Sequence, residues 1–157
     1  MPDEPTPEAI DFIWSQADSR LEAQLRQADA LDTKAGVLVG VHALAAGLVA
    51  SIVSSLSQAG RWVAIAVLAG LTLSGGAALQ AFRTHEFDRG PSPQTLWRFS
   101  GWARTEIRHR FLSTRFRVLE RNADRLLSKA RWIARSLAIL AVIALMVVIS
   151  VIVELVH

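Results

Sequence analysis

The sequence has few side chains that could do chemistry together. In the segment THEFDRG, His85, Glu86 and Asp88 lie close together, and His109 follows on a predicted helix. Imidazole and carboxylate groups are typical zinc ligands, but the same residues are ordinary in a solvated turn, which is the interpretation we favour. The chain has no cysteine, and it lacks the common catalytic and phosphate-loop motifs. We therefore expect neither an enzyme nor a metal site.

A second group of polar side chains consists of arginines interleaved with aromatic residues in the segment 97–125. Guanidinium groups can hold a phosphate while an aromatic ring stacks on a base. The candidates for such a nucleotide site are Arg104, Arg108, Arg115 and Trp102. The alternative, which composition alone favours, is that these arginines contact anionic lipid headgroups. A nucleic acid polymer is not expected as a partner, because no DNA-binding motif accompanies the charge.

Three long apolar segments separate these polar groups: 35–56, 62–82 and 133–156. Each has about the 20 residues that an α-helix needs to cross the hydrocarbon of a bilayer, and none shows the polar stripe of a soluble helix. The third contains two charged residues, Arg135 and Glu154, near its ends, where long side chains reach the headgroups. The first is too long for a signal peptide and follows an acidic segment. We predict three transmembrane helices.

The distribution of lysine and arginine predicts their orientation. Of the 17 basic residues, twelve lie in the segment 83–132, three lie in 1–34, and the short turn 57–61 holds only Arg61. The segment 83–132 should therefore be cytoplasmic. Two crossings earlier, the segment 1–34 should be cytoplasmic as well, and the C-terminus should lie outside.

Both cytoplasmic segments are predicted to be helical. Thr6 can cap a helix that starts at Pro7, and apolar residues then recur every three or four positions, so one helix should run from about residue 7 to residue 56. The apolar residues are Ile10, Trp14, Ala17, Leu21, Leu25, Ala28, Leu31 and Ala35. After a loop at 88–94, a second apolar stripe leads into the third membrane helix, with a kink expected near 113–114. This stripe consists of Leu112, Phe116, Leu119, Ala123, Leu126, Ala130 and Ile133.

The two segments also carry opposite charge. Residues 1–34 have a net charge of −5 and residues 83–132 a net charge of +7. We expect them to pack together as an antiparallel or bundled layer. The predicted fold is thus an all-α membrane protein with three transmembrane helices and a cytosolic layer, formed by an N-terminal amphipathic helix and a long basic helical insert between the second and third crossings.

Some residues inside the apolar segments are polar or small. His42 lies about two turns into the first membrane helix and should face protein or water. It either lines a pore or forms a structural hydrogen bond with a neighbour such as Ser74 or Gln80, and we favour the structural role. Gln80 is a weaker polar candidate of the same kind. Glycines at 36, 40, 70, 75 and 76 form ridges that should mainly pack the first helix on the second, with self-association as the alternative.

The stretch LDTKAGVLVGVHALAAGL, which contains Asp32 and Lys34, resembles the start of the first membrane helix in the Pycsar transmembrane effectors of bacterial antiphage defence. The stretch VLERNADRLLSKARWIARSLAIL resembles the entry to the last membrane helix of that family, where an asparagine and a lysine, here Asn122 and Lys129, precede the apolar run. The helix order and the large insert also fit. His42 departs from the family pattern, which has asparagine or a small residue in many members.

The resemblance implies an effector in the bacterial inner membrane that senses a cyclic pyrimidine mononucleotide, cUMP or cCMP. A pyrimidine nucleotide cyclase would make this ligand upon phage infection, and the effector, as a homo-oligomer in the lipid bilayer, would impair the membrane and cause abortive infection. Asp32 and Lys34 would lie at the junction between sensor and membrane helix. The alternative is a small membrane scaffold, such as a transport or conjugation accessory protein, which binds a protein partner through its cytosolic helices.

Overall fold

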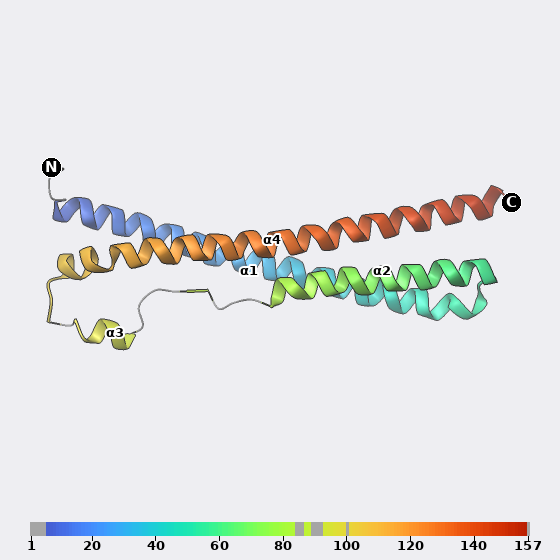
Figure 1. The fold of residues 1–157 in the computed structure, drawn as a ribbon, viewed down its shortest axis with the longest axis horizontal. Coiled ribbons are helices and arrows are strands. Elements are labelled where there is room, and N and C mark those ends of the chain that lie inside the picture. The colour runs from blue at the N-terminus through green and yellow to red at the C-terminus, as the bar shows by residue number, and fades with distance from the viewer. Residues whose placement is uncertain (1–5, 84–86, 89–92, 100, 157) are drawn as a thin grey trace. The chain divides into compact units, whose positions relative to one another are not determined.

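The computed structural model describes residues 6–83, 87–88, 93–99 and 101–156, and the regular elements in this part of the chain are all helices. Figure 1 shows their order along the chain. They are α1 (Pro7–Ile52), the 3-10 turn η1 (Val53–Ser55), α2 (Gln58–Phe82), α3 (Pro93–Trp97) and α4 (Arg104–Val156). Three of them contain apolar stretches long enough to cross a membrane. The predicted all-α class with three membrane-spanning helices is therefore confirmed.

The ends of the first two long helices follow from local hydrogen bonds. The hydroxyl of Thr6 accepts a hydrogen bond from the backbone N–H of Ala9, as expected of an N-cap before a proline. The hydroxyl of Ser57 caps α2 in the same way by accepting from the N–H of Gly60. Because of this cap, α2 begins at Gln58, inside the segment predicted to be the turn 57–61. At 113–114, where a kink was predicted, α4 continues as one helix without a break.

The chain divides into two compact units. Unit 1 comprises Met1–Ala28 and His85–Leu126, and unit 2 comprises Asp29–Thr84 and Leu127–His157. The helices α1 and α4 each contribute residues to both units, whereas α2 belongs to unit 2 and α3 to unit 1.

In unit 1, α1 and α4 run parallel to each other. Asp11 pairs with Arg108 and Asp18 pairs with Arg115, and each pair is separated by 97 residues, which is possible only if both helices advance in the same direction. Of the two arrangements expected for the polar segments, the antiparallel one is therefore wrong. The physical reason lies in the topology that the sequence itself predicts, since both helices continue into membrane helices that would cross in the same direction.

The buried face of α4 in unit 1 matches the predicted apolar stripe in part, since Leu119 and Leu126 of that stripe are buried. The core cluster combines Ala17 and Leu21 of α1 with Val118 and Leu119 of α4. Phe116, which the prediction placed in the stripe, is 44% exposed. The stripe also left out Asn122, which is fully buried but polar and so does not count in an apolar pattern.

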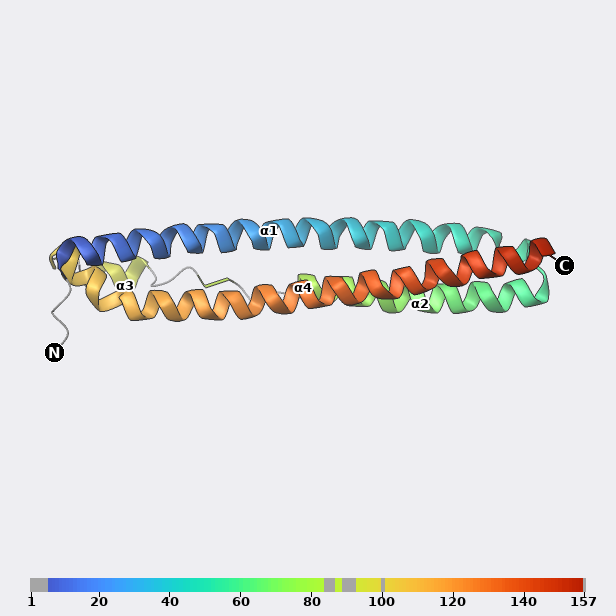
Figure 2. The same cartoon turned by 90° about the horizontal axis from the view of Figure 1, so that it is seen from above.

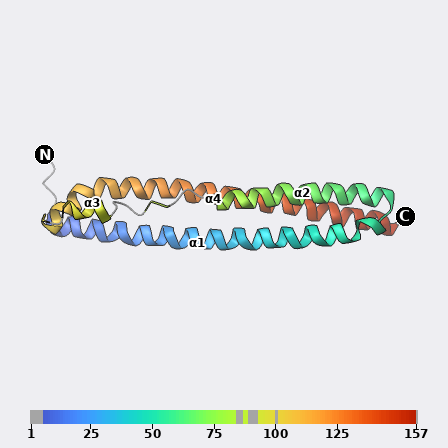
Figure 3. The same ribbon diagram turned by 90° about the horizontal axis from the view of Figure 1, so that it is seen from below.

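In unit 2, α2 lies alongside the C-terminal parts of α1 and α4, as Figures 2 and 3 show from opposite sides. One cluster joins Ala35, Ala81 and Ile133, and a second joins Val67, Leu71 and Ile143, so each holds residues of α2 and α4. These small and aliphatic side chains allow the three helices to approach closely.

The glycines of unit 2 have different surroundings. A Cβ atom on Gly70 would lie 2.9 Å from Cδ1 of Ile143, so this position packs α2 on α4 rather than on α1. Gly36 faces Phe82 and Gly75 faces His42, and both therefore serve the predicted packing of α1 on α2. Gly40, Gly47 and Gly76 have no neighbouring atom within 4 Å of such a Cβ in the described part of the chain. The prediction thus holds for part of the ridges only.

Candidate functional site

The helix α4 carries a column of polar residues on its packed side. Its members recur every seven residues, which on an α-helix keeps them on nearly one face. They are Arg108, Arg115, Asn122, Lys129 and Ser136, and we call them the α4 polar column. Asn122, Lys129 and Ser136 are buried. Buried polar groups need hydrogen-bond partners, and each member of the column contacts one.

The first two members form ion pairs with α1 around a tryptophan. Arg108 donates a hydrogen bond to the carboxylate of Asp11, and Arg115 donates one to the carboxylate of Asp18. The guanidinium carbons of Arg108 and Arg115 lie 6.0 Å and 5.5 Å from the ring centroid of Trp14, within reach of a cation–π interaction. Two cations, two carboxylates and one indole ring therefore form a single cluster in unit 1, which we call the Trp14 cluster.

Arg115 is the more buried of the two arginines. Burial lowers the pKa of the Arg115 guanidinium through desolvation. An arginine starts so far above neutrality that it still carries its charge at pH 7. A partly buried permanent cation beside an aromatic ring is suited to bind an anion, provided that its own carboxylate partner moves away.

Asn122 contacts the backbone of the segment that follows α2. Its side-chain oxygen accepts a hydrogen bond from the N–H of Asp88 at 3.2 Å, and its amide nitrogen donates one to the carbonyl of Asp88 at 2.9 Å. The side chain of Asn122 therefore bonds to both the backbone N–H and the backbone carbonyl of Asp88. Asn122 holds this part of the connection against α4.

Lys129 forms the most enclosed ion pair of the described residues. Its Nζ lies 2.7 Å and 2.8 Å from the two carboxylate oxygens of Asp32. The Lys129 side chain is 5% exposed and that of Asp32 is 37% exposed. Lys34, the other residue predicted to act at the junction of the polar and apolar segments, is exposed. The structure thus joins Asp32 to a lysine of α4 rather than to the neighbouring lysine of α1.

The last member of the column takes part in a hydrogen-bond network that joins all three long helices. Nε2 of His42 lies 2.6 Å from Oγ of Ser74, and Oγ of Ser74 lies 2.7 Å from the carbonyl oxygen of Ser136. His42 is 5% exposed and both serines are fully buried. Gln80, the second polar candidate inside the apolar segments, is exposed and takes no part in this network.

A second cluster of aromatic and cationic side chains lies just before and within the start of α4. The guanidinium carbon of Arg110 lies 5.4 Å from the ring centroid of Trp102 and 5.9 Å from that of Phe99. Phe99 makes edge-on contacts with both Trp102 and Phe111. Arg104, the first residue of α4, is exposed. Of the four predicted nucleotide ligands, the structure brings Arg108 and Arg115 together at Trp14, and it places Trp102 beside Arg110.

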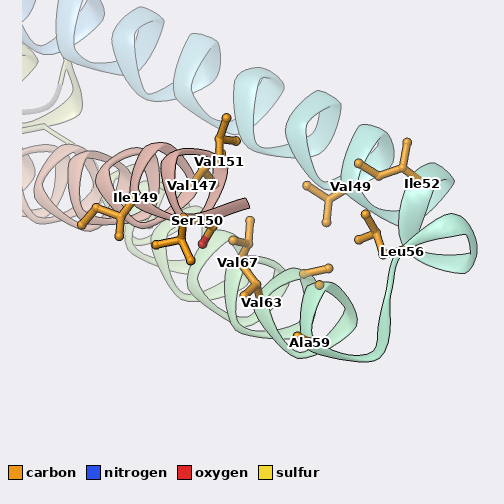
Figure 4. Close-up of a pocket in the computed structure, with 13 residues that line it drawn as sticks. Val49, Ile52, Leu56, Ala59, Val63, Val67, Val147, Ile149, Ser150 and Val151 are labelled. Carbon is orange, nitrogen blue, oxygen red and sulfur yellow. The ribbon is translucent and has the colours of Figure 1, made fainter. Parts of the chain in front are cut away.

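The other candidate sites offer less chemistry. His85 and Glu86 lie outside the described residues, and the described part of the chain holds no cluster of three or more metal-binding side chains. An apolar groove of about 360 Å³ opens among α1, α2 and α4, lined by residues such as Val49, Val63 and Val147 (Figure 4). Among the described residues that line it, Ser150 has the only polar side chain, and none of them carries a charge that would recognise a nucleotide.

Sequence reasoning singled out Asp32, His42, Arg108 and Arg115 but missed how they are connected. The signal was present as a spacing of seven residues, because Asp11, Asp18 and Asp32 on α1 match Arg108, Arg115 and Lys129 on α4. Trp14 was placed only in an apolar stripe, and Ser136 was not considered. Ser74 was named as one possible partner of His42, and the structure shows that contact.

Comparison with protein families gives a match to this chain. No curated protein and no solved structure matches the chain. A family model described as the Pycsar effector protein domain matches residues 16–156, which is nearly the whole chain and includes Asp32, His42, Asn122 and Lys129. The chain therefore belongs to the Pycsar effector protein family, and its membrane-spanning helices identify it as a membrane effector of Pycsar defence.

Proposed function

We propose that the protein senses cUMP or cCMP through unit 1 and responds by impairing the bacterial inner membrane, which causes abortive infection. The observation that supports this best is the Trp14 cluster, in which Arg108 and Arg115 lie against one indole ring while paired with Asp11 and Asp18. It offers the two chemistries that a cyclic nucleotide needs, namely guanidinium donors for the phosphate and an aromatic face for the base.

The phosphate of the ligand would bind by replacing an aspartate carboxylate as the partner of an arginine. The phosphate of a cyclic mononucleotide is an anion, and Arg108 or Arg115 can hold it only by releasing part of its contact with Asp11 or Asp18. Nucleotide binding and the pairing of α1 with α4 in unit 1 therefore compete for the same guanidinium groups. Arg104 and Trp102 are proposed as further ligand contacts outside the Trp14 cluster, since Trp102 lies beside Arg110 and Arg104 is the exposed first residue of α4.

Competition of this kind makes the ligand a switch. A ligand changes a conformational equilibrium only if it binds one arrangement better than the other. A tenfold bias requires about 1.4 kcal/mol, which is no more than one charge-assisted hydrogen bond contributes, about 1.5–3 kcal/mol. Because α1 and α4 both continue into unit 2, a change in their pairing acts on two of the three membrane helices.

The test uses the two partners of one ion pair as matched variants. In full-length protein in lipid nanodiscs, Arg108→Gln and Asp11→Asn both remove the pair, but only the second leaves the guanidinium available. Calorimetric titration with cUMP and cCMP should show at least about a tenfold loss of affinity in Arg108→Gln, and equal or tighter binding in Asp11→Asn. Arg115→Gln and Asp18→Asn form a second matched set. An equal loss in both members of a set would contradict the site.

The proposal also includes the orientation in the membrane, the source of the ligand and self-association. We place unit 1 in the cytoplasm and the C-terminus outside, on the basis of the lysine and arginine distribution, with a pyrimidine nucleotide cyclase as the source of the ligand. Self-association in the bilayer is supported by Gly40, Gly47 and Gly76, which have no neighbour in the described chain and would let a second helix approach. Dye release from vesicles on addition of cUMP or cCMP measures the membrane effect.

The alternative is a membrane scaffold that binds a protein partner through unit 1. It is favoured by Phe12 and Trp97, whose side chains are 64% and 80% exposed, because large exposed aromatic groups often mark protein contacts. A scaffold should bind neither cyclic nucleotide. Phe12→Ser and Trp97→Ser would weaken partner capture while leaving the titrations above unchanged.

A further inference from the structure

The three apolar segments of the sequence end at one level of unit 2. The first begins at residue 35, the second ends at residue 82 and the third begins at residue 133. Ala35, Ala81 and Ile133 form one buried cluster, so these three ends lie side by side. Because an α-helix rises 1.5 Å per residue, residues within two or three positions of the cluster lie at nearly the same depth. This level is therefore one surface of the hydrocarbon layer, where lipid headgroups begin.

Arg135 lies just inside this surface and needs an anion. It follows Ile133 by two residues, and it is exposed, as is Arg131 one turn earlier. None of the ion pairs among the described residues involves either arginine. Like charges four residues apart on a helix repel each other, and an arginine in contact with hydrocarbon is costly unless its charge is compensated. The compensating anion must then come from outside the described chain.

Trp132 holds the guanidinium group of Arg135 in a defined position. The guanidinium carbon lies 4.7 Å from the ring centroid of Trp132, within reach of a cation–π interaction. Trp132 is itself packed against the cluster of Ala35, Ala81 and Ile133. Because helical side chains lean toward the N-terminus of their helix, Arg135 reaches back across the indole ring toward Arg131 and the headgroups. This arginine is therefore positioned, unlike one that moves freely on the surface.

We propose that Arg131, Trp132 and Arg135 form a binding site for the headgroup of an anionic phospholipid. The phosphate would lie between the two guanidinium groups, which bind phosphate through charge-assisted hydrogen bonds. The indole N–H of Trp132 is a further donor at the depth where tryptophan is typically found. Lys34 on α1 and Arg83 on α2 are exposed at the same level and add positive charge that attracts anionic lipid.

The surroundings favour a phospholipid over a soluble anion. Ala138 and Val142 follow Arg135 by three and seven residues, so they share its face of α4, and both are exposed and apolar. An acyl chain attached to the bound phosphate would cover them, whereas inorganic phosphate would leave them uncovered. The site lies within unit 2, so it does not depend on the nucleotide that unit 1 would bind.

Arg135→Gln and Arg121→Gln form a matched pair of variants for the test. Both arginines are exposed on α4, and they are fourteen residues apart, which places them on one face of the helix. Each variant removes one positive charge, but Arg121 lies about 21 Å along the helix from Arg135, twice the Debye length of about 10 Å at 0.1 M salt. Full-length protein in neutral detergent is titrated with dioleoylphosphatidylglycerol, dioleoylphosphatidylcholine or inorganic phosphate. Native mass spectrometry counts bound lipid, and thermal unfolding reports stabilisation.

The unmodified protein should bind phosphatidylglycerol at least about tenfold more tightly than phosphatidylcholine, and Arg135→Gln should remove about tenfold of this preference. Arg121→Gln should keep the preference within about twofold, because the removed charge is screened at that distance. Equal losses in the two variants would overturn the proposal, since net charge alone would then explain the preference. Equal stabilisation by inorganic phosphate would overturn it as well, because the site would then bind any anion.

Arg135→Lys tests the stacked geometry without touching the core of unit 2. Lysine keeps the charge but lacks the planar group that stacks on an indole ring and binds phosphate through two parallel hydrogen bonds. The preference for phosphatidylglycerol should fall by at least about threefold. An unchanged preference in Arg135→Lys would show that the position needs only a positive charge, which contradicts a site built around Trp132.

Discussion

In unit 1 the α4 polar column begins with two guanidinium groups that face carboxylates of α1, whereas in unit 2 it ends in a serine whose partner is Ser74 of α2, which in turn contacts His42. The difference follows the surroundings. The side chains of Asp11 and Asp18 are 46% and 40% exposed, so water also solvates their charges. Ser74 and Ser136 are fully buried among apolar helices, where hydrogen bonds between small polar groups are the less costly solution.

Lys129 lies between these two cases along α4. It is a charged member of the column, as in unit 1, but it is nearly fully buried, as in unit 2. At each step of seven residues, the residue type on α4 follows the residue type at the corresponding position of α1. Where α1 carries an aspartate, α4 carries a cation. Where α1 carries Leu25 or Val39, α4 carries a neutral polar residue, and its partner comes from Asp88 or from α2.

The largest effect should come from breaking the buried pair. Asp32→Ala leaves the Lys129 ammonium enclosed without this carboxylate, and unfolding free energy should fall by about 3–5 kcal/mol. Equilibrium unfolding in mixed micelles measures this loss. Lys34→Ala is the control, because Lys34 is exposed and its removal should change stability by less than about 0.5 kcal/mol. If both variants lowered the unfolding free energy equally, the pair of Asp32 and Lys129 would not be the contact that stabilises this junction.

A loss of about 1–3 kcal/mol is expected for Asn122→Ala, because the N–H and carbonyl of Asp88 both lose the partner that this side chain provides. Hydrogen exchange of the Asp88 amide should accelerate, while that of amides in α2 should stay unchanged. Unaltered exchange at Asp88 would show that the connection is held by other contacts.

Gly70→Ala tests how closely the helices of unit 2 approach each other. The new methyl group would meet Ile143 at 2.9 Å, and overpacking should cost about 1–3 kcal/mol unless the isoleucine shifts. Gly40→Ala adds the same methyl group at a position with no neighbour and should be neutral or slightly stabilising. Adding Ile143→Ala to Gly70→Ala should recover part of the loss. Additive losses in the double variant would argue against the contact.

The smallest effects should distinguish the two classes of ion pair in unit 1. Asp18→Asn disrupts a partly buried pair and should cost about 1 kcal/mol, whereas Glu22→Gln disrupts a pair with both side chains more than 70% exposed and should cost at most about 0.5 kcal/mol. Thermal unfolding at two salt concentrations measures both. Salt should reduce the effect of Glu22→Gln more strongly, because exposed charges are screened more completely.

Much of the architecture could be predicted from the sequence. The length and apolarity of three segments predicted three membrane-spanning helices, and the spacing of Ile10, Ala17, Leu21 and Ala28 predicted the buried side of α1. The buried side of α4 was predicted only in part. Leu119, Leu126 and Ile133 are buried as predicted, whereas Asn122 and Lys129 were missed because they are polar and interrupt the apolar pattern. The ion pairs of the Trp14 cluster were indicated only by the spacing of seven residues within each segment. That spacing does not determine the register between two segments 97 residues apart.

The sequence by itself determined the helices and the family, because both depend on properties that are local along the chain: apolar length, capping residues and short motifs. Only the tertiary structure decided the partners, namely Asp32 with Lys129, Asn122 with Asp88, and His42 with Ser74. The reason is that a hydrogen bond or ion pair depends on distances between helices. Helix period restricts which residues share a face, but it does not restrict which face of which helix lies opposite.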